Sequence, residues 1–275
     1  MIRIMCRCFI LTFLGLTLST TALFAADKPV SVSGMSIGVI ARYDDHGTGI
    51  PLDVALKMGV KAIQLKAPYP DKRTDRDVQI ILDKVKKAGV RITSVQSGFT
   101  DESYKSIDIV RKTVGLVPAA TREERMEQFR GVCVFAKKLG LDTVCFHFGF
   151  VPHDTKSKQY KDVVDTMRFC CDFATGQGLQ INLETGQETG PALLQFITDV
   201  NRTNLFINFD PANMILYGCG EPIEALKLVG KYVRSVHCKD ACWASKRGTD
   251  WGKEVPFGQG NVNARLFIQT LKDIG

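Results

Sequence analysis

The chain has 275 residues, of which 45% are hydrophobic, 24% charged and 9% aromatic. This mixture is sufficient for a folded core and excludes a disordered or fibrous protein. The net charge of +7 falls to +5 if Arg3 and Arg7 are removed with a leader, and so small a charge over a long chain does not predict a nucleic-acid partner.

Residues 1–26 have the pattern of a secretory signal peptide. Arg3 and Arg7 precede an apolar run, residues 9–18, and small residues at Ala25 and Ala26 come before a polar segment. The run is shorter than the roughly 20 residues of a membrane-spanning helix, and no later segment could span. We therefore predict cleavage and export to the periplasm or the exterior, with no stable membrane span in the mature domain of residues 27–275.

The remaining cysteines are expected to be mostly free, buried thiols. Seven cysteines follow the predicted leader, so they cannot all form pairs with one another. Cys145 and Cys238 fall in predicted strands and Cys133 in a predicted helix, where a thiol acts as a small apolar side chain.

From Ser36 onward, short β-branched runs alternate with longer amphipathic stretches, the pattern of parallel strands joined by crossover helices. The predicted strands are Ser36–Ala41, Ala62–Lys66, Ile92–Gln96, Thr143–His147, Leu179–Glu184, Leu205–Asp210 and Val233–Lys239. The predicted helices are Pro51–Met58, Asp75–Ala88, Thr121–Leu139, Lys158–Thr175, Pro191–Val200, Ile223–Val229 and Ala264–Ile274. No linker interrupts the series, so we expect a single domain.

The alternation within the strands distinguishes a barrel from an open sheet. In residues 179–184 and 205–210, apolar side chains occupy one face of the strand and polar side chains the other. A doubly wound sheet is covered on both faces and would favour apolar residues on both. Polar residues concentrated inward near the strand ends fit a (β/α)8 TIM barrel, which is the predicted fold.

Three potential metal ligands end three consecutive predicted strands. Glu184, Asp210 and His237 are each separated by one strand–helix unit, so a barrel would place them side by side at the mouth. Two carboxylates brought together need a compensating proton or cation, and this donor set suits Mn²⁺, Mg²⁺, Co²⁺ or Zn²⁺. We predict a divalent metal site.

Each residue also has a purely structural interpretation. Asp210 precedes Pro211 and could act only as a helix N-cap, and His237 could be a hydrogen-bonded core histidine. Glu184 has no comparable structural explanation, because a buried carboxylate needs a partner. Their joint occurrence at matched positions favours the metal site.

Several segments resemble the xylose isomerase-like TIM-barrel superfamily, with the sugar phosphate isomerase/epimerase group as the nearest branch. The similar segments are residues 181–188, 208–214 and 236–241, and residues 257–263 resemble the Gly-x-Gly loop before the last helix of that family. The likeness extends over essentially everything after Ser36.

The resemblance implies that a Glu, an Asp, a His and a final Glu from strands five to eight hold the metal. It assigns the first three to Glu184, Asp210 and His237, whereas the final Glu has no counterpart before Gly275. We therefore expect a barrel truncated before its eighth strand, and a 275-residue chain that is inactive for want of that ligand.

The implied reaction is isomerisation or epimerisation of a small carbohydrate by proton abstraction next to a carbonyl, through an enediolate, with Glu184 as the base. A metal-dependent lyase or dehydratase acting on an oxidised sugar or inositol is the alternative. An endonuclease-like phosphodiesterase or a non-catalytic sugar-binding barrel is favoured less.

Other inward polar residues are candidates for substrate binding. They are His147, Gln96, Lys66, Gln64, Lys239 and Asp240. Trp243 and Trp251 could give a sugar an apolar platform or could pack within a lid, while His46 and His153 are expected to be structural or solvated. The sequence does not predict the oligomeric state.

Overall fold

The computed structural model describes residues 3–6, 31–32, 35–45 and 47–275. Most of the predicted signal peptide, residues 1–26, lies outside the described residues, and so does His46. Within the described part of the chain, no helix is both long enough and apolar enough to cross a membrane.

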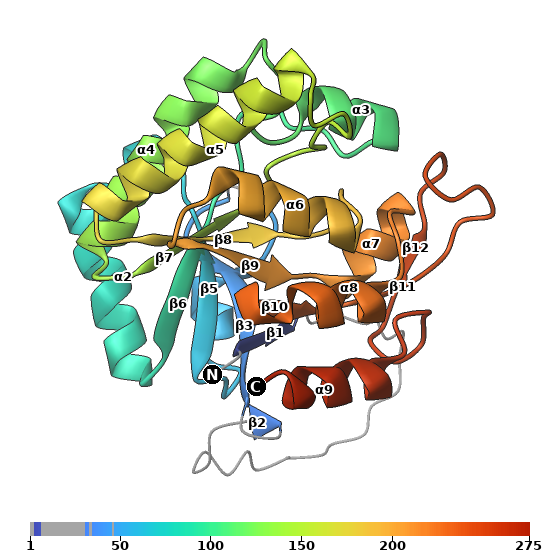
Figure 1. Cartoon of the computed structure of the whole chain (residues 1–275). Coiled ribbons are helices and arrows are strands. Elements are labelled where there is room, and N and C mark those ends of the chain that lie inside the picture. The colour runs from blue at the N-terminus through green and yellow to red at the C-terminus, as the bar shows by residue number, and fades with distance from the viewer. Residues whose placement is uncertain (1–2, 7–30, 33–34, 46) are drawn as a thin grey trace.

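Eight parallel strands form a TIM barrel, as the sequence predicts (Figure 1). In spatial order they are β1 (Arg3–Cys6), β10 (Val233–Cys238), β9 (Leu205–Phe209), β8 (Gln180–Glu184), β7 (Thr143–Phe146), β6 (Arg91–Gln96), β5 (Ala62–Lys66) and β3 (Met35–Arg42). The first strand pairs with both β10 and β3, so the sheet closes on itself. Because a closed sheet has one interior, side chains from distant strands converge there.

No strand after β10 joins the barrel. This agrees with the prediction, which gave seven barrel strands from Ser36 onward and no eighth strand after them. The place between β10 and β3 is instead taken by β1, which comes from the segment predicted to be a leader. The seven strands predicted from Ser36 onward are all present, with ends that differ by one residue at most.

The larger helices cover the outside of the barrel, and the smaller elements lie mostly in its loops (Figure 1). The larger ones are α2 (Asp75–Ala88), α4 (Arg122–Lys138), α5 (Lys158–Gly176), α6 (Gly190–Val200), α8 (Pro222–Val229) and α9 (Ala264–Asp273). The smaller helices are α1 (Leu52–Ala55), α3 (Ile107–Thr113), α7 (Pro211–Tyr217), η1 (Pro70–Lys72) and η2 (Gly230–Tyr232), and the smaller strands are β2 (Ser31–Val32), β4 (Ile50–Pro51), β11 (Asp240–Cys242) and β12 (Lys253–Val255).

Local signals explain where the long helices begin and end. Thr74 caps α2 by accepting a hydrogen bond from the Asp77 backbone N–H, and Gly89 ends the helix in the left-handed conformation.

Helices α3 and α7 and the hairpin of β11 and β12 are absent from the sequence prediction. Helix α3 has only 7 residues, too few for a clear amphipathic period.

The apolar face of the strands packs against the helices, while the barrel interior is polar. Asn182 Nδ2 donates to Ser235 Oγ at 3.3 Å, and this hydroxyl donates to Asn208 Oδ1 at 2.5 Å. These three residues lie on β8, β10 and β9, so the inward side chains bond to one another across the barrel. This confirms the strand faces predicted from the alternation.

In the described part of the chain, six of the cysteines that follow the predicted leader are free thiols, and four of these are buried: Cys133, Cys145, Cys170 and Cys171. Burial raises the pKa of Cys133 to about 12, so this thiol stays protonated at neutral pH. The expectation of mostly buried, unpaired thiols is confirmed for the residues that the structure describes.

Candidate metal and active site

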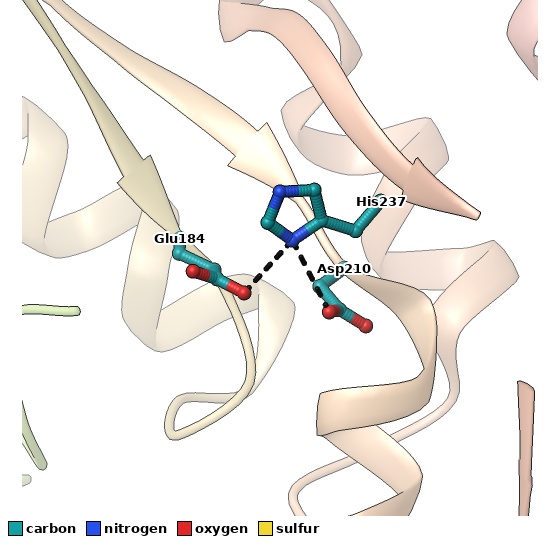
Figure 2. Close-up of side chains that lie close together, drawn as sticks. All are labelled: Glu184, Asp210 and His237. Carbon is teal, nitrogen blue, oxygen red and sulfur yellow. Dashed lines mark hydrogen bonds and ion pairs between the residues drawn. The ribbon is translucent and has the colours of Figure 1, made fainter. Parts of the chain in front are cut away.

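Glu184, Asp210 and His237 converge at the carboxyl end of the barrel strands (Figure 2). One ligand atom from each lies within 4.8 Å of the others. The His237 ring sits between the two carboxylates, with Nδ1 at 2.9 Å from Glu184 Oε1 and 3.5 Å from Asp210 Oδ2. All three side chains are buried, with exposed fractions of 7%, 0% and 2% in chain order. The predicted cluster is therefore present.

The two oxygens of Asp210 have separate tasks. Oδ1 accepts the backbone N–H of Asn213 at 3.1 Å and so caps α7, which begins at Pro211. Oδ2 is buried and accepts no hydrogen bond. The N-cap interpretation from the sequence is thus correct for one oxygen. The other lies 3.3 Å from Lys239 Nζ and 3.5 Å from His237 Nδ1, so cationic groups already face it.

Glu184 is held by side chains from the two strands that follow β8 in the sheet order, with Gln96 ending β6 and His147 following β7. Its Oε2 accepts a hydrogen bond of 2.6 Å from Gln96 Nε2 and lies 3.2 Å from His147 Nε2. Its Oε1 faces His237 and also accepts a weaker bond of 3.4 Å from Asn213 Nδ2. Two of the predicted substrate-binding residues, Gln96 and His147, therefore contact a predicted ligand directly.

The electrostatics favour an ionised carboxylate beside a protonated imidazole. Burial by itself would raise the pKa of Glu184, but the charges and hydrogen bonds of His147 and His237 outweigh it and hold that pKa well below its usual range. Burial would lower the pKa of His237, whereas Glu184 and Asp210 raise it to about 9. The proton on His237 thus supplies the positive charge that a bound cation would replace.

Lys239 adds a second positive charge at the edge of the cluster. Its Nζ lies 3.3 Å from Asp210 Oδ2 and donates to Asn213 Oδ1 at 3.0 Å. On its other side, Nζ lies 3.4 Å from Glu254 Oε2 on β12. Lys239 therefore connects the cluster to the hairpin formed by β11 and β12.

A close approach of two backbone segments brings Asn213 to Glu184. Gly186 has φ of +146°, and a Cβ added there would collide with the Cβ of Asn213. Only glycine combines that backbone conformation with the missing side chain. The loop after β8 can therefore lie directly against α7.

These residues fit a divalent cation. Two carboxylates and one imidazole nitrogen form a donor set that suits Mg²⁺, Mn²⁺ and Zn²⁺, whose bonds are about 2.0–2.2 Å. The acceptor atom Asp210 Oδ2, buried without a hydrogen bond, is the feature that a cation would satisfy.

The remaining predicted substrate-binding residues have different surroundings. Gln64 contacts His237, with Oε1 at 2.9 Å from Nε2. Lys66 ends β5 in register with Gln96, and its charge opposes the rise that burial causes in the pKa of Cys145.

Asp240 organises a loop. Its Oδ1 accepts the backbone N–H groups of Ala241 and Val262, and its Oδ2 accepts those of Gly258 and Gly260, at 2.8–3.0 Å. A Cβ at Gly260 would collide with the Asp240 carboxylate, so glycine allows this approach. This observation supports a loop-anchoring role for Asp240.

The tryptophans pack within the loops. Trp251 lies against Tyr217 with 4.8 Å between ring centroids, and the Arg247 guanidinium lies 3.8 Å above the Trp243 ring. Trp251 also packs on the small cluster of Ile107, Val110, Val114 and Tyr217. Of the two interpretations left open by the sequence, these contacts favour packing within a lid.

The structure adds residues that the sequence reasoning missed. Asn213 lies on α7, which the sequence indicated only through the N-cap interpretation of Asp210, and Glu254 lies on β12, which was not predicted. Glu188 follows β8 in a loop, and its burial raises its pKa to about 7, while the Val151 N–H and the charge of His147 oppose the rise. A run of two glutamates within five residues, Glu184 and Glu188, was the signal in the sequence.

Comparison with known proteins agrees with this architecture. The model of the xylose isomerase-like TIM barrel family matches residues 52–275. A search of curated proteins finds no match.

A solved xylose isomerase domain protein from Planctomyces limnophilus is 45% identical, with a TM-score of 0.84, and the alignment covers 87% of this chain and 85% of that chain. A D-tagatose 3-epimerase-like protein is 19% identical, with a TM-score of 0.66 and 86% of each chain covered. The IOLI protein with a bound zinc atom is 20% identical, with a TM-score of 0.63, covering 86% of this chain and 85% of that one.

The chain therefore belongs to the xylose isomerase-like TIM barrel family. The two more distant structures share the fold.

Proposed function

We propose that the protein is a divalent-metal-dependent sugar isomerase or epimerase that removes a proton next to a carbonyl through an enediolate. The observation that carries this proposal is the buried cluster of Glu184, Asp210 and His237, in which Asp210 Oδ2 accepts no hydrogen bond. Mn²⁺, Mg²⁺, Co²⁺ or Zn²⁺ bound there would stabilise the negative charge that develops on the substrate oxygens.

The chain's own residues would divide the remaining work. Glu184 and Asp210 supply anionic oxygens, and Gln96 and His147 fix the Glu184 carboxylate in one orientation. Lys239 lies at the edge of the cluster, where its ammonium group would bind and orient a substrate oxygen.

Glu184 is proposed as both ligand and base. Its lowered pKa means that it is ionised at neutral pH and ready to accept a proton, although a strongly lowered pKa weakens its basicity. Glu188, with a pKa of about 7, has the proton affinity better suited to exchange at neutral pH. The two carboxyl groups therefore need to be tested side by side.

The test has two parts. Isothermal titration of the chelator-treated protein with Mn²⁺ or Zn²⁺ should give one site, which the Asp210→Asn variant loses. A panel of free and phosphorylated ketoses and aldoses in ²H₂O should then show deuterium entering the carbon next to the carbonyl, against the expectation from the sequence that a chain without the final Glu is inactive.

The Glu184→Gln variant should abolish this exchange, with Glu188→Gln as the matched comparison. General-base removal typically costs about 10²–10⁴-fold in rate. Metal binding in Glu184→Gln distinguishes a lost base from a lost ligand. A wild-type protein that binds none of these ions would contradict the proposed function.

A lyase or dehydratase is the second candidate, because abstraction of the same proton begins that reaction and the site geometry serves both. The two reactions differ in their products. Loss of water from an oxidised sugar or inositol, detected as an unsaturated product, would favour the lyase.

We also propose that the protein is exported, so that its substrate is an unphosphorylated carbohydrate. The argument is the pattern of residues 1–26, and cleavage after them would remove β1 from its place between β10 and β3. Fusion of these residues to a reporter that is active only outside the cytoplasm tests it directly. A reporter that stays inactive, with an uncleaved leader, would contradict export.

A further inference from the structure

Gln64 lies inside the barrel on β5, across from His237 on β10. Its Oε1 is 2.9 Å from His237 Nε2, and its Nε2 donates a hydrogen bond of 3.0 Å to Ser94 Oγ on β6. The Gln64 side chain has no exposed surface, and Ser94 is 4% exposed. A continuous chain of contacts thus runs from Ser94 through Gln64 to the imidazole.

The ring of His237 has two nitrogens with different neighbours. Nδ1 faces Glu184 and Asp210, whereas Nε2 faces Gln64. A neutral imidazole binds a cation through the nitrogen that carries no proton, so binding through Nδ1 requires the proton on Nε2. That N–H then needs an acceptor, because it is buried.

The amide of Gln64 is oriented to be that acceptor. Its NH₂ group donates to Ser94 Oγ at 3.0 Å. The carbonyl oxygen is therefore left for His237. Reversing the amide would place NH₂ hydrogens against the Nε2–H of the ring, with the loss of a buried hydrogen bond.

We propose that Gln64, oriented by Ser94, is a positioning residue that fixes the tautomer and the ring angle of His237 so that Nδ1 is the metal ligand. This inference rests on the metal centre of the proposed function and changes the role predicted for Gln64 from substrate binding to ligand orientation. Acceptors that hold the second nitrogen of a metal-bound histidine typically change metal affinity by about 10–100-fold.

The competing explanation is that Gln64 only satisfies a buried polar group. In that case its loss would lower the stability of the fold but leave the metal affinity unchanged. Measurements of the metal affinity and of the protonated nitrogen of His237 therefore distinguish a positioning role of Gln64 from a purely structural one. The free energy of unfolding does not, because both roles predict that it falls.

The experiment compares Zn²⁺ affinity in three variants by competition with a chromogenic chelator. Gln64→Leu removes the acceptor and should weaken binding by about 10–100-fold. Gln64→Glu keeps an acceptor oxygen and should restore at least the wild-type affinity. Gln180→Leu is the matched control, because Gln180 begins β8 and donates to Thr143 rather than to a ligand.

Long-range ¹H–¹⁵N spectra of the Zn²⁺-loaded wild-type protein provide a readout that survives if Gln64→Leu fails to fold. We expect His237 to carry its proton on Nε2 and the metal on Nδ1. A proton on Nδ1, or unchanged affinity in a folded Gln64→Leu variant, would overturn the inference. Ser94→Ala should give a smaller loss of affinity than Gln64→Leu.

Failure of this inference is distinguishable from failure of the proposed function. If the wild-type protein and the Gln64→Leu variant bind Zn²⁺ with equal affinity, the metal centre exists but Gln64 does not position its ligand. A wild-type protein with no Zn²⁺ site contradicts the metal centre itself, and the positioning role with it.

Discussion

The two walls of the barrel use the same inward-facing pattern for different purposes. On the ligand wall, β8 to β10, Glu184, Asp210 and His237 converge on one point. On the orienting wall, β5 to β7 with the residue that follows, inward polar side chains instead contact the ligands. Gln64 bonds to His237, and Gln96 and His147 bond to Glu184; these contacts are 2.6–3.2 Å long.

The difference between the walls is one of charge. The ligand wall carries both carboxylates, whereas the orienting wall contacts the ligands through two neutral amides and His147, whose charge lowers the pKa of Glu184. A neutral amide can hold an ionised group in place without cancelling the charge that attracts a cation. An inward polar residue near a strand end can therefore be a metal ligand or can hold a ligand in place. The side chains that it meets inside the barrel decide between these two roles.

The largest effect is expected from removing one charge on the ligand wall. Asp210→Asn keeps an oxygen that can cap α7, but it places an NH₂ group where Oδ2 faces the cluster. Metal affinity should fall by roughly 100-fold or more, about 3 kcal/mol for one ligand. Calorimetric titration measures it.

Gln96→Leu on the orienting wall should cost only about tenfold, in the range of outer-shell partners. Asp83→Asn on α2 is the control for loss of a carboxylate, since Asp83 bonds only to Gln79 in its own helix among the contacts described. If Gln96→Leu weakens binding as much as Asp210→Asn, the distinction between the walls does not hold.

The sequence predicts the ligand wall better than the orienting wall. Glu184, Asp210 and His237 stand at equal phase in consecutive strand–helix units, and parallel strands bring such residues together whatever their loops do. The role of Gln64 is not predictable in this way, because Oε1 meets His237 across the barrel, at a separation of 173 residues along the chain. Strand alternation gives the face of a residue but not its partner.

The short elements in the loops also limit what can be predicted about the site from the sequence. Helix α7 begins at Pro211 and brings Asn213 to Glu184, while β12 brings Glu254 to Lys239. Both elements are short, with 7 and 3 residues, so their formation depends on tertiary contacts rather than on local periodicity.

The next largest effect concerns the loop that the Asp240 carboxylate anchors. In Asp240→Asn, an NH₂ group replaces one oxygen and faces the backbone N–H donors of Gly258 and Gly260, leaving these two donors partly buried and unpaired. The free energy of unfolding should fall by about 3 kcal/mol, measured by urea denaturation. Trypsin should also cut faster at Lys253, on the strand that this loop follows.

Asp250→Asn, at an exposed position in the same loop region, is the control and should change stability by less than about 0.5 kcal/mol. Equal stability of Asp240→Asn and the wild type would show that the carboxylate does not anchor the loop. Substrate binding, the role predicted from the sequence, would then be the better explanation for its position.

Glu184, which ends β8, and Glu188, in the loop that follows, give a comparison within the ligand wall. The pKa of Glu184 is held well below its usual range, whereas burial raises that of Glu188 from 4.5 to about 7. A raised pKa means that the folded state holds the proton more tightly than the unfolded chain. Stability therefore falls as the pH rises from 4.5 to 7, and the full cost, about 3 kcal/mol, is present above pH 7.

Glu188→Gln should remove that cost. Its stability relative to wild type should be near zero at pH 4.5 and should increase to about 2–3 kcal/mol at pH 8, as measured by urea denaturation at a series of pH values. A constant difference across this range would show that Glu188 does not titrate there. Glu224→Gln on the exposed face of α8 controls for the loss of one surface charge.

The smallest of these effects concerns Lys239, the positive charge of the ligand wall. Its ammonium group lies 3.3 Å from Asp210 Oδ2, where it stabilises the carboxylate in the absence of a cation and repels a cation that binds beside it. Lys239→Met should therefore tighten metal binding by about tenfold, about 1.4 kcal/mol, even though it removes three polar contacts. Lys253→Met, at an exposed neighbouring position on β12, is the charge-matched control. Weaker binding in Lys239→Met alone would mean that the ammonium group holds Asp210 in its ligating position, so that a cationic residue acts on this wall as the neutral amides act on the other.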